Sequence, residues 1–367
     1  MLRLITTLAL VTLLLTSVPV QAFPGDERDE RCAELLAAGI VTEDCLPDTG
    51  LSALELRAAQ ANMELYPAPD VVPVEYQERI VWERSYRRLL SPAVIYDAPN
   101  GNPIRTWDAG YNFVTVISSE GDWVQINYGE WVEAESIDWA DVSEFAGAEI
   151  HNTLKRPFAW MLAEAYPSSY PGGEQNRDAE MIDRYTMMNI YGVEFVDGWE
   201  WYLVGPDQWV QQIRVAKVQP TPRPEGVGPD DFWVAVDLYE QTAVAYEGDR
   251  MVFATLISSG LPQWDTNLGL FNIYERYAAT KMSGAEGQVD FYFIEEVPYV
   301  MYYDGEISLH GTYWHDRFGY RQSHGCVNLS IMDAWWIYQW TEAQPEAWVY
   351  VFSSGEYRSD LPNWARR

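Results

Sequence analysis

The sequence predicts a mainly β protein with a short helical segment near its N-terminus and one short helix near its C-terminus. Runs of valine, isoleucine and aromatic residues recur from about residue 83 onward, separated by turns rich in glycine, asparagine and proline. Proline-rich stretches at 66–83 and 219–230 divide the 367 residues into several units. We therefore expect one or two small barrels followed by a C-terminal sandwich or closed sheet.

The first 22 residues predict a signal peptide. Arg3 precedes an apolar run, and Val20 and Ala22 place small residues before an expected cleavage site at Phe23. The apolar run is shorter than the ~20 residues that a spanning helix needs. We expect a chain that is exported to the cell wall, the periplasm or the medium and has no membrane span after cleavage.

The formal net charge is −31, with acidic residues spread along the chain. Nucleic acids and anionic membranes bind basic surfaces, so this charge argues against both as partners. A solvated acidic surface is sufficient to explain it.

Three cysteines are present, and an exported chain can form disulfides. Cys32 and Cys45 are close in sequence and are candidates for a local disulfide, although two free thiols or a bond to another chain remain alternatives. Cys326 is then the odd cysteine, which marks it as a candidate reactive thiol.

Residues 23–82 are expected to form a helical N-terminal segment and a linker, because 33–38 and 51–63 are rich in alanine, leucine and glutamate. Residues 83–145 change to short β-runs at 93–97, 114–117, 123–126 and 130–132. The order Tyr-Asp-x-Pro, Gly-Asp-Trp-Val-Gln-Ile and Trp-Val in this segment resembles a bacterial SH3-like domain.

Residues 148–218 repeat part of that pattern. The run Gly198-Trp199-Glu200-Trp201 echoes Gly121-Asp122-Trp123-Val124, so a second, divergent SH3-like domain is expected. Paired modules favour a binding role, while the alternative is that tryptophan only fills small barrel cores. A stiff proline-rich linker at 219–229 follows.

Residues 230–353 are expected to form the last domain. Its β-runs are 232–237, 242–246, 251–258, 270–274, 290–294, 299–303, 307–310 and 348–352. One helix is expected at about 331–340, with Ser330 as its N-cap. The pattern predicts a β sandwich or closed sheet with a single short helix.

Three of the four histidines lie close to Cys326 in sequence. His310 ends a β-run, and a hairpin-like excursion would return the chain to Ser323, just before the cysteine. A thiol needs a base or a local field to become nucleophilic at neutral pH, so His310 and Cys326 predict a base and its nucleophile. Backbone N–H groups of the turn at Gly325 could form an oxyanion hole.

The segment His310…Ser323-His324-Gly325-Cys326-Val327-Asn328 resembles the signature of the L,D-transpeptidases with a YkuD-type catalytic domain. The run 255–260 and the Gly-x-Phe-x-Ile run at 269–273 extend the resemblance, which covers about 230–353. The resemblance implies that Cys326 is the nucleophile and His310 the base, that the Gly311 carbonyl orients His310 or His324, and that the N–H groups of Gly325 and Cys326 form the oxyanion hole. It also implies that Ser323, His324 and Asn328 support the turn. Apart from the resemblance, Tyr303 and Trp314 flank the site as aromatic residues and are candidates for a substrate wall, although such residues more often belong to the core.

The resemblance also implies a reaction. The family acylates its cysteine with a peptidoglycan tetrapeptide stem, releases the terminal D-alanine and passes the acyl group to an amine, which forms cross-links or attaches proteins. It implies carbapenem-type inhibitors and no metal or organic cofactor. This chain departs from the family at Thr266-Asn267-Leu268-Gly269, where Thr-Pro-x-Gly is usual, and in a short loop between His310 and Ser323.

Three alternatives remain. His310, His315, His324 and Cys326 could hold a structural zinc ion, although the full hexapeptide favours catalysis. An L,D-carboxypeptidase or other hydrolase would use the same residues with water as acceptor. A non-catalytic cell-wall-binding protein would explain the paired SH3-like units but would leave the Ser-His-Gly-Cys motif idle.

Overall fold

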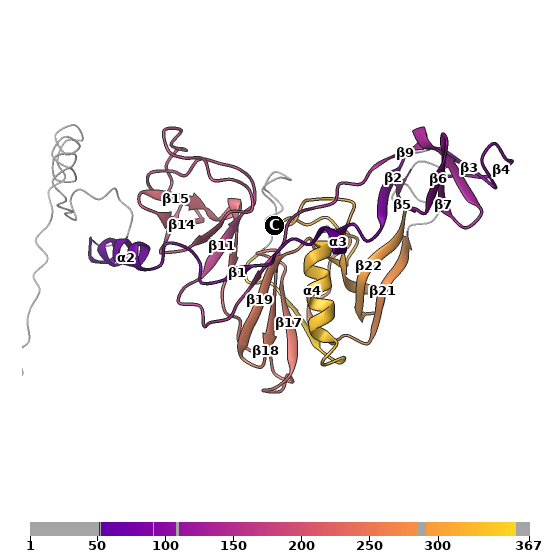
Figure 1. Cartoon of the computed structure of the whole chain (residues 1–367). Helices are drawn as coiled ribbons and strands as arrows, with labels where there is room; N and C mark the ends of the chain where they lie inside the picture. Colours follow the sequence, from indigo (N-terminus) through magenta and orange to yellow (C-terminus); the bar gives the residue numbers. More distant parts are fainter. Residues whose placement is uncertain (1–50, 52, 91, 108–109, 285–290, 357–367) are drawn as a thin grey trace, which may run out of the picture. The chain divides into compact units, whose positions relative to one another are not determined.

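A computed structural model describes residues 51, 53–90, 92–107, 110–284 and 291–356. The chain is mainly β, as predicted (Figure 1). The expected signal peptide, the helix at 33–38 and the Cys32–Cys45 pair lie outside the described residues. Within the described part of the chain, no helix is long and apolar enough to cross a membrane.

The elements follow the chain in three groups. The first contains α2 (Ala53–Leu65), β1 (Val72–Pro73), α3 (Glu78–Val81), β2 (Ser85–Leu89), β3 (Ala93–Tyr96), β4 (Pro103–Trp107), β5 (Tyr111–Val116), β6 (Ser118–Glu120), β7 (Trp123–Asn127), β8 (Glu130–Glu133), η2 (Ala134–Ser136), β9 (Ile137–Trp139) and β10 (Ala148–Glu149). The second contains β11 (Phe158–Met161), β12 (Met187–Asn189), β13 (Gly192–Val196), β14 (Trp199–Gly205), β15 (Gln208–Gln211), η3 (Gln212–Arg214) and β16 (Val215–Val218). The third contains β17 (Phe232–Asp237), β18 (Thr242–Glu247), β19 (Arg250–Leu256), β20 (Gly269–Asn272), β21 (Glu275–Gly284), β22 (Tyr292–Asp304), β23 (Ile307–Gly311), β24 (Val327–Leu329), α4 (Ile331–Thr341) and β25 (Trp348–Phe352).

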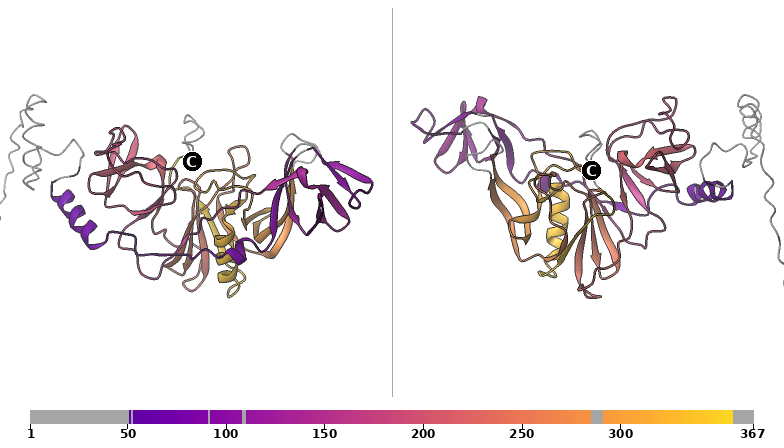
Figure 2. Two further views of the ribbon diagram at one scale, coloured as in Figure 1. Left: turned by 45° about the horizontal axis from the view of Figure 1, so that its top comes forward. Right: turned by 180° about the vertical axis from the view of Figure 1, so that it is seen from behind.

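Two large sheets and α4 build the C-terminal part. The first sheet has the order β1-β10-β19-β18-β17-β25-β20, and the second has the order β24-β23-β22-β5-β2-β9, with β21 paired to β22. Val234 of the first sheet, Leu309 and Val327 of the second, and Ile337 of α4 are fully buried in one apolar cluster. The core therefore lies between the two sheets, as in a sandwich (Figures 1 and 2).

Strand β17 shows why a continuous apolar run is needed in the first sheet. Its side chains alternate, so Val234 and Val236 enter the core between the sheets while Trp233 and Ala235 enter a second core on the opposite face. That second core contains Trp160 of β11. The small sheet β12-β11-β16 thus covers the outer face of the first sheet.

Helix α4 agrees with the predicted helix at 331–340. The Ser330 side chain accepts a hydrogen bond from the Asp333 N–H at 3.1 Å, which is the expected N-cap. The buried Asp333 carboxylate also accepts from the Gly147 N–H at 2.7 Å and from the Thr255 hydroxyl. Burial raises the pKa of Asp333 to about 6.

Two strand predictions were wrong in detail. The runs at 290–294 and 299–303 are parts of one long strand, β22, which bends at Glu296 and Tyr299, where φ is 45° and 54°. Pro298 lies between the two runs and within β22. Strand β21 was not predicted, because its run Glu275–Gly284 is largely polar and only partly buried.

Both segments expected to be linkers pack against the C-terminal part of the chain. At 66–83, β1 pairs with β10, which pairs with β19, and Ile80 and Val81 of α3 are buried. The proline-rich segment at 219–230 has no helix or strand, as expected, yet it packs against the C-terminal part. Val227 is buried, and the Thr221 N–H donates to the Tyr246 hydroxyl at 2.7 Å.

Residues 85–139, here called the N-terminal β module, have a core of their own that includes Leu89, Ile95 and Val132. Its strands β3, β4, β6, β7 and β8 form a five-stranded sheet, whereas β2, β5 and β9 continue the second large sheet (Figure 1). The SH3-like assignment of this module and of 148–218, and the domain boundaries drawn from the sequence, stay predictions.

Candidate active site

Strands β23 and β24 bring the predicted base and nucleophile together. They pair in parallel, with Leu309 opposite Val327 and His310 opposite Asn328. The expected hairpin-like return was wrong, because the chain between the two strands crosses over and runs in the same direction again. Side chains two residues apart on a strand share a face, so His310 and Asn328 lie on the same face as Ser308 and Cys326.

Cys326 directly precedes β24 and is partly exposed. Its Sγ lies 3.7 Å from the Ser308 Oγ and 3.7 Å from the Glu306 carbonyl oxygen. Burial raises the pKa of the Cys326 thiol, and the hydrogen bonds from Ser308 oppose this rise only in part. The resting cysteine is therefore a protonated thiol at neutral pH and needs a base to react.

His310 is buried in β23, which pairs with the strand that follows Cys326. Its Nδ1 lies 3.0 Å from the Gly311 carbonyl oxygen. A carbonyl can only accept, so Nδ1 carries the proton and Nε2 keeps a free lone pair. Burial lowers the pKa of His310 to about 4, so the imidazole is neutral at pH 7. A neutral imidazole with a free Nε2 can accept a proton.

The turn before Cys326 is held by two hydroxyl groups. The Ser323 hydroxyl donates to the Cys326 carbonyl oxygen and accepts from the Gly325 N–H at 3.1 Å. The Thr266 hydroxyl donates to the Gly325 carbonyl oxygen at 2.7 Å. Gly325 has φ of +118°, a region that side chains rarely adopt, which explains the glycine here.

A cavity of about 520 Å³ opens in front of this turn. Cys326, His310, Ser323, His324 and Asn328 all line it. Its other lining residues are largely aromatic or aliphatic: Gly110, Tyr111, Leu261, Trp264, Met282, Phe291, Tyr292, Ile294, Glu306, Ile307, Trp314 and Gln322. The cavity thus combines an apolar wall with a few polar groups, as small-molecule and peptide sites do.

The structure places Trp314, Tyr303 and His324 in three different surroundings. Trp314 lines the cavity and its ring centroid lies 5.6 Å from that of His310. Tyr303 is 3% exposed, packs on Phe271 in the core and is absent from the described cavity wall. The His324 ring lies 3.8 Å from the Trp264 ring, centroid to centroid, and is exposed.

His315, for which the sequence indicated no role, is buried against Asn328. Its Nε2 lies 2.9 Å from the Asn328 side-chain amide, and its Nδ1 accepts from the Arg317 N–H at 3.2 Å. The atom of Asn328 that faces this ring is the amide nitrogen Nδ2. His315 thereby fixes the orientation of a cavity residue.

Ser308, Thr266 and Trp264 are residues of the site that the sequence did not indicate. Ser308 had a usable signal, because it precedes His310 by two positions on a strand and must share its face. Trp264 had none, and Thr266 was noted only as the start of the run that replaces Thr-Pro-x-Gly, because both lie in an irregular loop about 60 residues before the cysteine. Among the described residues, no group of three or more His, Cys, Asp or Glu could hold a metal ion.

Residues 231–351 match the family model described as YkuD, the L,D-transpeptidase catalytic domain. This matched part, 231–351, is called the YkuD domain here. The chain is also similar to YciB of Bacillus subtilis (strain 168), a protein provisionally named an L,D-transpeptidase, with 31% identity over 120 residues. That match spans 29% of this chain and 59% of YciB.

Solved structures are similar to this chain more loosely. An L,D-transpeptidase from Stackebrandtia nassauensis is 24% identical and covers 38% of this chain and 60% of its own, at a TM-score of 0.28. An L,D-transpeptidase from Enterococcus faecium is 25% identical and covers 33% and 50%, at a TM-score of 0.29. With TM-scores below 0.5, it is the family model that identifies the domain.

Proposed function

We propose that the protein is a cysteine L,D-transpeptidase that acts on the tetrapeptide stems of peptidoglycan. The observation that carries the proposal is that the parallel strands β23 and β24 bring His310 and Cys326, the residue just before β24, into one cavity, with the His310 Nδ1 held at 3.0 Å from the Gly311 carbonyl oxygen. The match of 231–351 to the YkuD family supplies the substrate class.

The first half of the reaction forms an acyl-enzyme. His310 Nε2 takes the proton of the Cys326 thiol as the sulfur adds to the carbonyl carbon after the diamino acid of the stem. The tetrahedral intermediate collapses, the C–N bond to the terminal D-alanine breaks, and His310 returns the proton to the departing amine. A thioester between Cys326 and the tripeptide remains.

The second half transfers the acyl group. An amine of a neighbouring stem adds to the thioester, His310 takes a proton from that amine, and the thiolate leaves and is protonated again. The Cys326 N–H is the candidate oxyanion donor, since the Gly325 N–H already donates to Ser323. No step needs a metal or an organic cofactor.

The low pKa of His310 and the raised pKa of Cys326 favour a neutral pair over a preformed thiolate and imidazolium. Proton transfer then accompanies attack on the carbonyl, as in general-base catalysis. The resting thiol is thereby less exposed to adventitious alkylation and oxidation.

Export remains part of the proposal and rests on the first 22 residues of the sequence. Peptidoglycan lies outside the cytoplasmic membrane, so substrate and location agree. Inhibition by carbapenems belongs to the same proposal; a solved L,D-transpeptidase in complex with imipenem is among the structures similar to this chain.

The proposal is tested with disaccharide tetrapeptides from a bacterial wall and the purified full chain. We expect mass spectrometry to show cross-linked dimers and released D-alanine, and intact mass to show one carbapenem adduct on Cys326. Cys326→Ala should lose both products. Tripeptides without dimers would instead assign a carboxypeptidase, and no product together with no adduct would contradict an enzymatic function.

A further inference from the structure

The N-terminal β module reaches the catalytic cavity through backbone pairing. Strand β5 of the module lies beside β22 in parallel, with Tyr111 opposite Tyr292 and Phe113 opposite Ile294. The Tyr111 N–H donates to the Phe291 carbonyl oxygen at 3.2 Å. This register places Gly110 and Tyr111 in the wall of the cavity that contains Cys326.

The Tyr111 side chain has a defined position there. Its hydroxyl donates to the Trp314 carbonyl oxygen at 3.0 Å, and its ring lies 4.8 Å from the Phe113 ring, centroid to centroid. Burial raises the pKa of Tyr111 to about 12, so the hydroxyl stays a donor at neutral pH. Tyr111 is 38% exposed and lines the cavity, so the residue is accessible to an occupant of the cavity.

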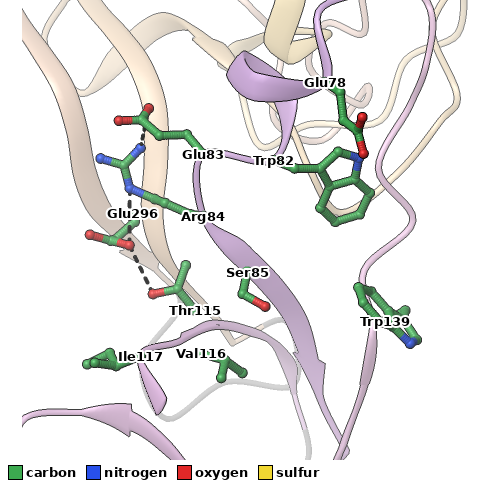
Figure 3. A pocket seen from close by; sticks show the side chains of 10 residues that line it. All are labelled: Glu78, Trp82, Glu83, Arg84, Ser85, Thr115, Val116, Ile117, Trp139 and Glu296. Atoms are coloured by element: carbon green, nitrogen blue, oxygen red, sulfur yellow. Dashed lines mark hydrogen bonds and ion pairs between the residues drawn. The ribbon is translucent and has the colours of Figure 1, made fainter.

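Further contacts join the N-terminal β module and the segment just before it to the YkuD domain. Glu296 of β22 accepts from the Thr115 hydroxyl at 2.9 Å and pairs with Arg84 at 3.2 Å, as Figure 3 shows. Tyr86 of β2 stacks on Tyr313 with ring centroids 4.0 Å apart. These contacts span three elements, so the wall that carries Tyr111 is fixed rather than attached through one strand alone.

We propose that Tyr111 is a substrate-positioning residue and that the N-terminal β module is a working part of the active site. The Tyr111 ring packs against the peptide stem and sets the position of its scissile carbonyl relative to Cys326. The identity of the stem rests on the proposed function, while the place of Tyr111 in the cavity wall does not.

The test compares three variants of the full chain: Tyr111→Ala removes the ring, Tyr111→Phe keeps the ring and removes only the hydrogen bond to Trp314, and Tyr128→Ala is the matched control. Tyr128 belongs to the same module, is 95% exposed and does not line the cavity. We expect Tyr111→Ala to raise KM for the tetrapeptide about five- to tenfold with a smaller change in kcat, because a lost aromatic contact weakens binding. Tyr111→Phe and Tyr128→Ala should stay near wild type.

A second measurement does not depend on the natural substrate. Alkylation at Cys326 is followed by peptide mapping with iodoacetamide, a small reagent, and with N-phenylmaleimide, a bulky one. Loss of the tyrosine wall should raise the bulky-to-small rate ratio by about threefold or more in Tyr111→Ala and leave it unchanged in Tyr128→Ala. Should Tyr111→Ala melt well below wild type, Tyr111→Leu, which keeps an apolar strand residue, is held to the same criteria.

The outcomes separate the two proposals. Wild-type protein that turns over tetrapeptides, with Tyr111→Ala matching Tyr128→Ala in KM, would overturn the role of Tyr111 and leave the enzyme intact. Wild-type protein that turns over no tetrapeptide would contradict the proposed function, and the alkylation ratio then decides on Tyr111 alone. An unchanged ratio in Tyr111→Ala would overturn the inference in that case.

Discussion

The Ser308 hydroxyl lies 3.7 Å from the Cys326 sulfur and is buried on the strand that also carries His310. It is a hydrogen-bond partner that lowers the pKa of a thiol whose burial raises it. Ser308 therefore partly offsets the effect of burial on how readily the nucleophile loses its proton.

Ser308→Ala should raise the thiol pKa further and slow the reaction of Cys326 with iodoacetamide at pH 7 about threefold, because the thiolate loses a stabilising donor. The pH profile of alkylation, mapped to the Cys326 peptide, measures both effects. Ser308→Thr keeps a hydroxyl at this position and serves as the matched control. Equal rates in wild type and Ser308→Ala would show that the contact has no influence on the thiol.

Because His310 is buried, acylation of Cys326 should continue to an unusually low pH. A base works only when it is neutral, and burial lowers the pKa of His310 to about 4. Carbapenem acylation of Cys326 should therefore persist at about pH 5 and decline only as the pH approaches about 4, rather than near the ordinary histidine value of about 6.5. Stopped-flow or intact-mass rates between these pH values measure it, and a half-maximal rate near 6.5 would contradict the assignment.

Removing the same histidine should remove the base. His310→Ala is expected to slow acylation about a hundredfold or more, since a positioned base typically contributes that much. Its control is His151→Ala, because His151 lies outside the YkuD domain and is exposed. Acylation of His310→Ala at the wild-type rate would assign the base to another group.

Ser323 should act through the shape of the turn. Ser323→Ala loses the hydroxyl that joins the Cys326 carbonyl to the Gly325 N–H, so turnover should fall about tenfold to a hundredfold. Ser323→Thr retains the hydroxyl and should recover most of the activity. If both variants are equally impaired, the size of the side chain rather than its hydrogen bonds matters at this position.

Asp333 predicts an effect on stability. Its carboxylate joins the Gly147 backbone and the Thr255 hydroxyl to the start of α4 and is fully buried. Asp333→Ala leaves the buried Gly147 N–H without this acceptor and the Thr255 hydroxyl with only the Leu256 carbonyl oxygen, and should lower the free energy of unfolding by about 2–4 kcal/mol, measured by urea titration. Asp249→Ala, at an exposed carboxylate, should change it by less than about 0.5 kcal/mol. Equal losses would show that the Asp333 contacts contribute little.

The part of the site that could be predicted from the sequence is the part encoded locally. His310, Ser323, Gly325 and Cys326 lie within 17 residues of one another and carry a specific motif. Helix α4 was predicted because Ser330 caps it, and β17 because its run is continuously apolar. In each case neighbouring residues decide the local structure.

The rest depends on contacts between distant segments. Tyr111 meets Tyr292 across 181 positions, and Thr266 meets Gly325 across 59, so no local pattern indicated either contact. For Tyr303 and Trp314, position near the motif did not indicate whether the side chain lies in the core or in the cavity. Both are aromatic residues near the motif, yet the packing of the core puts one inside it and the other in the cavity wall.

The pairing of β5 with β22 has a consequence for how the protein can be divided. A fragment starting after the proline-rich segment would lose β5 and leave the N–H and C=O groups of Tyr292–Ile294 at a bare sheet edge. Bare edges recruit strands from other molecules, so we expect such a fragment to self-associate. The pairing of β5 with β22 thus sets the smallest fragment expected to be monomeric, and this fragment includes residues far upstream of the family domain.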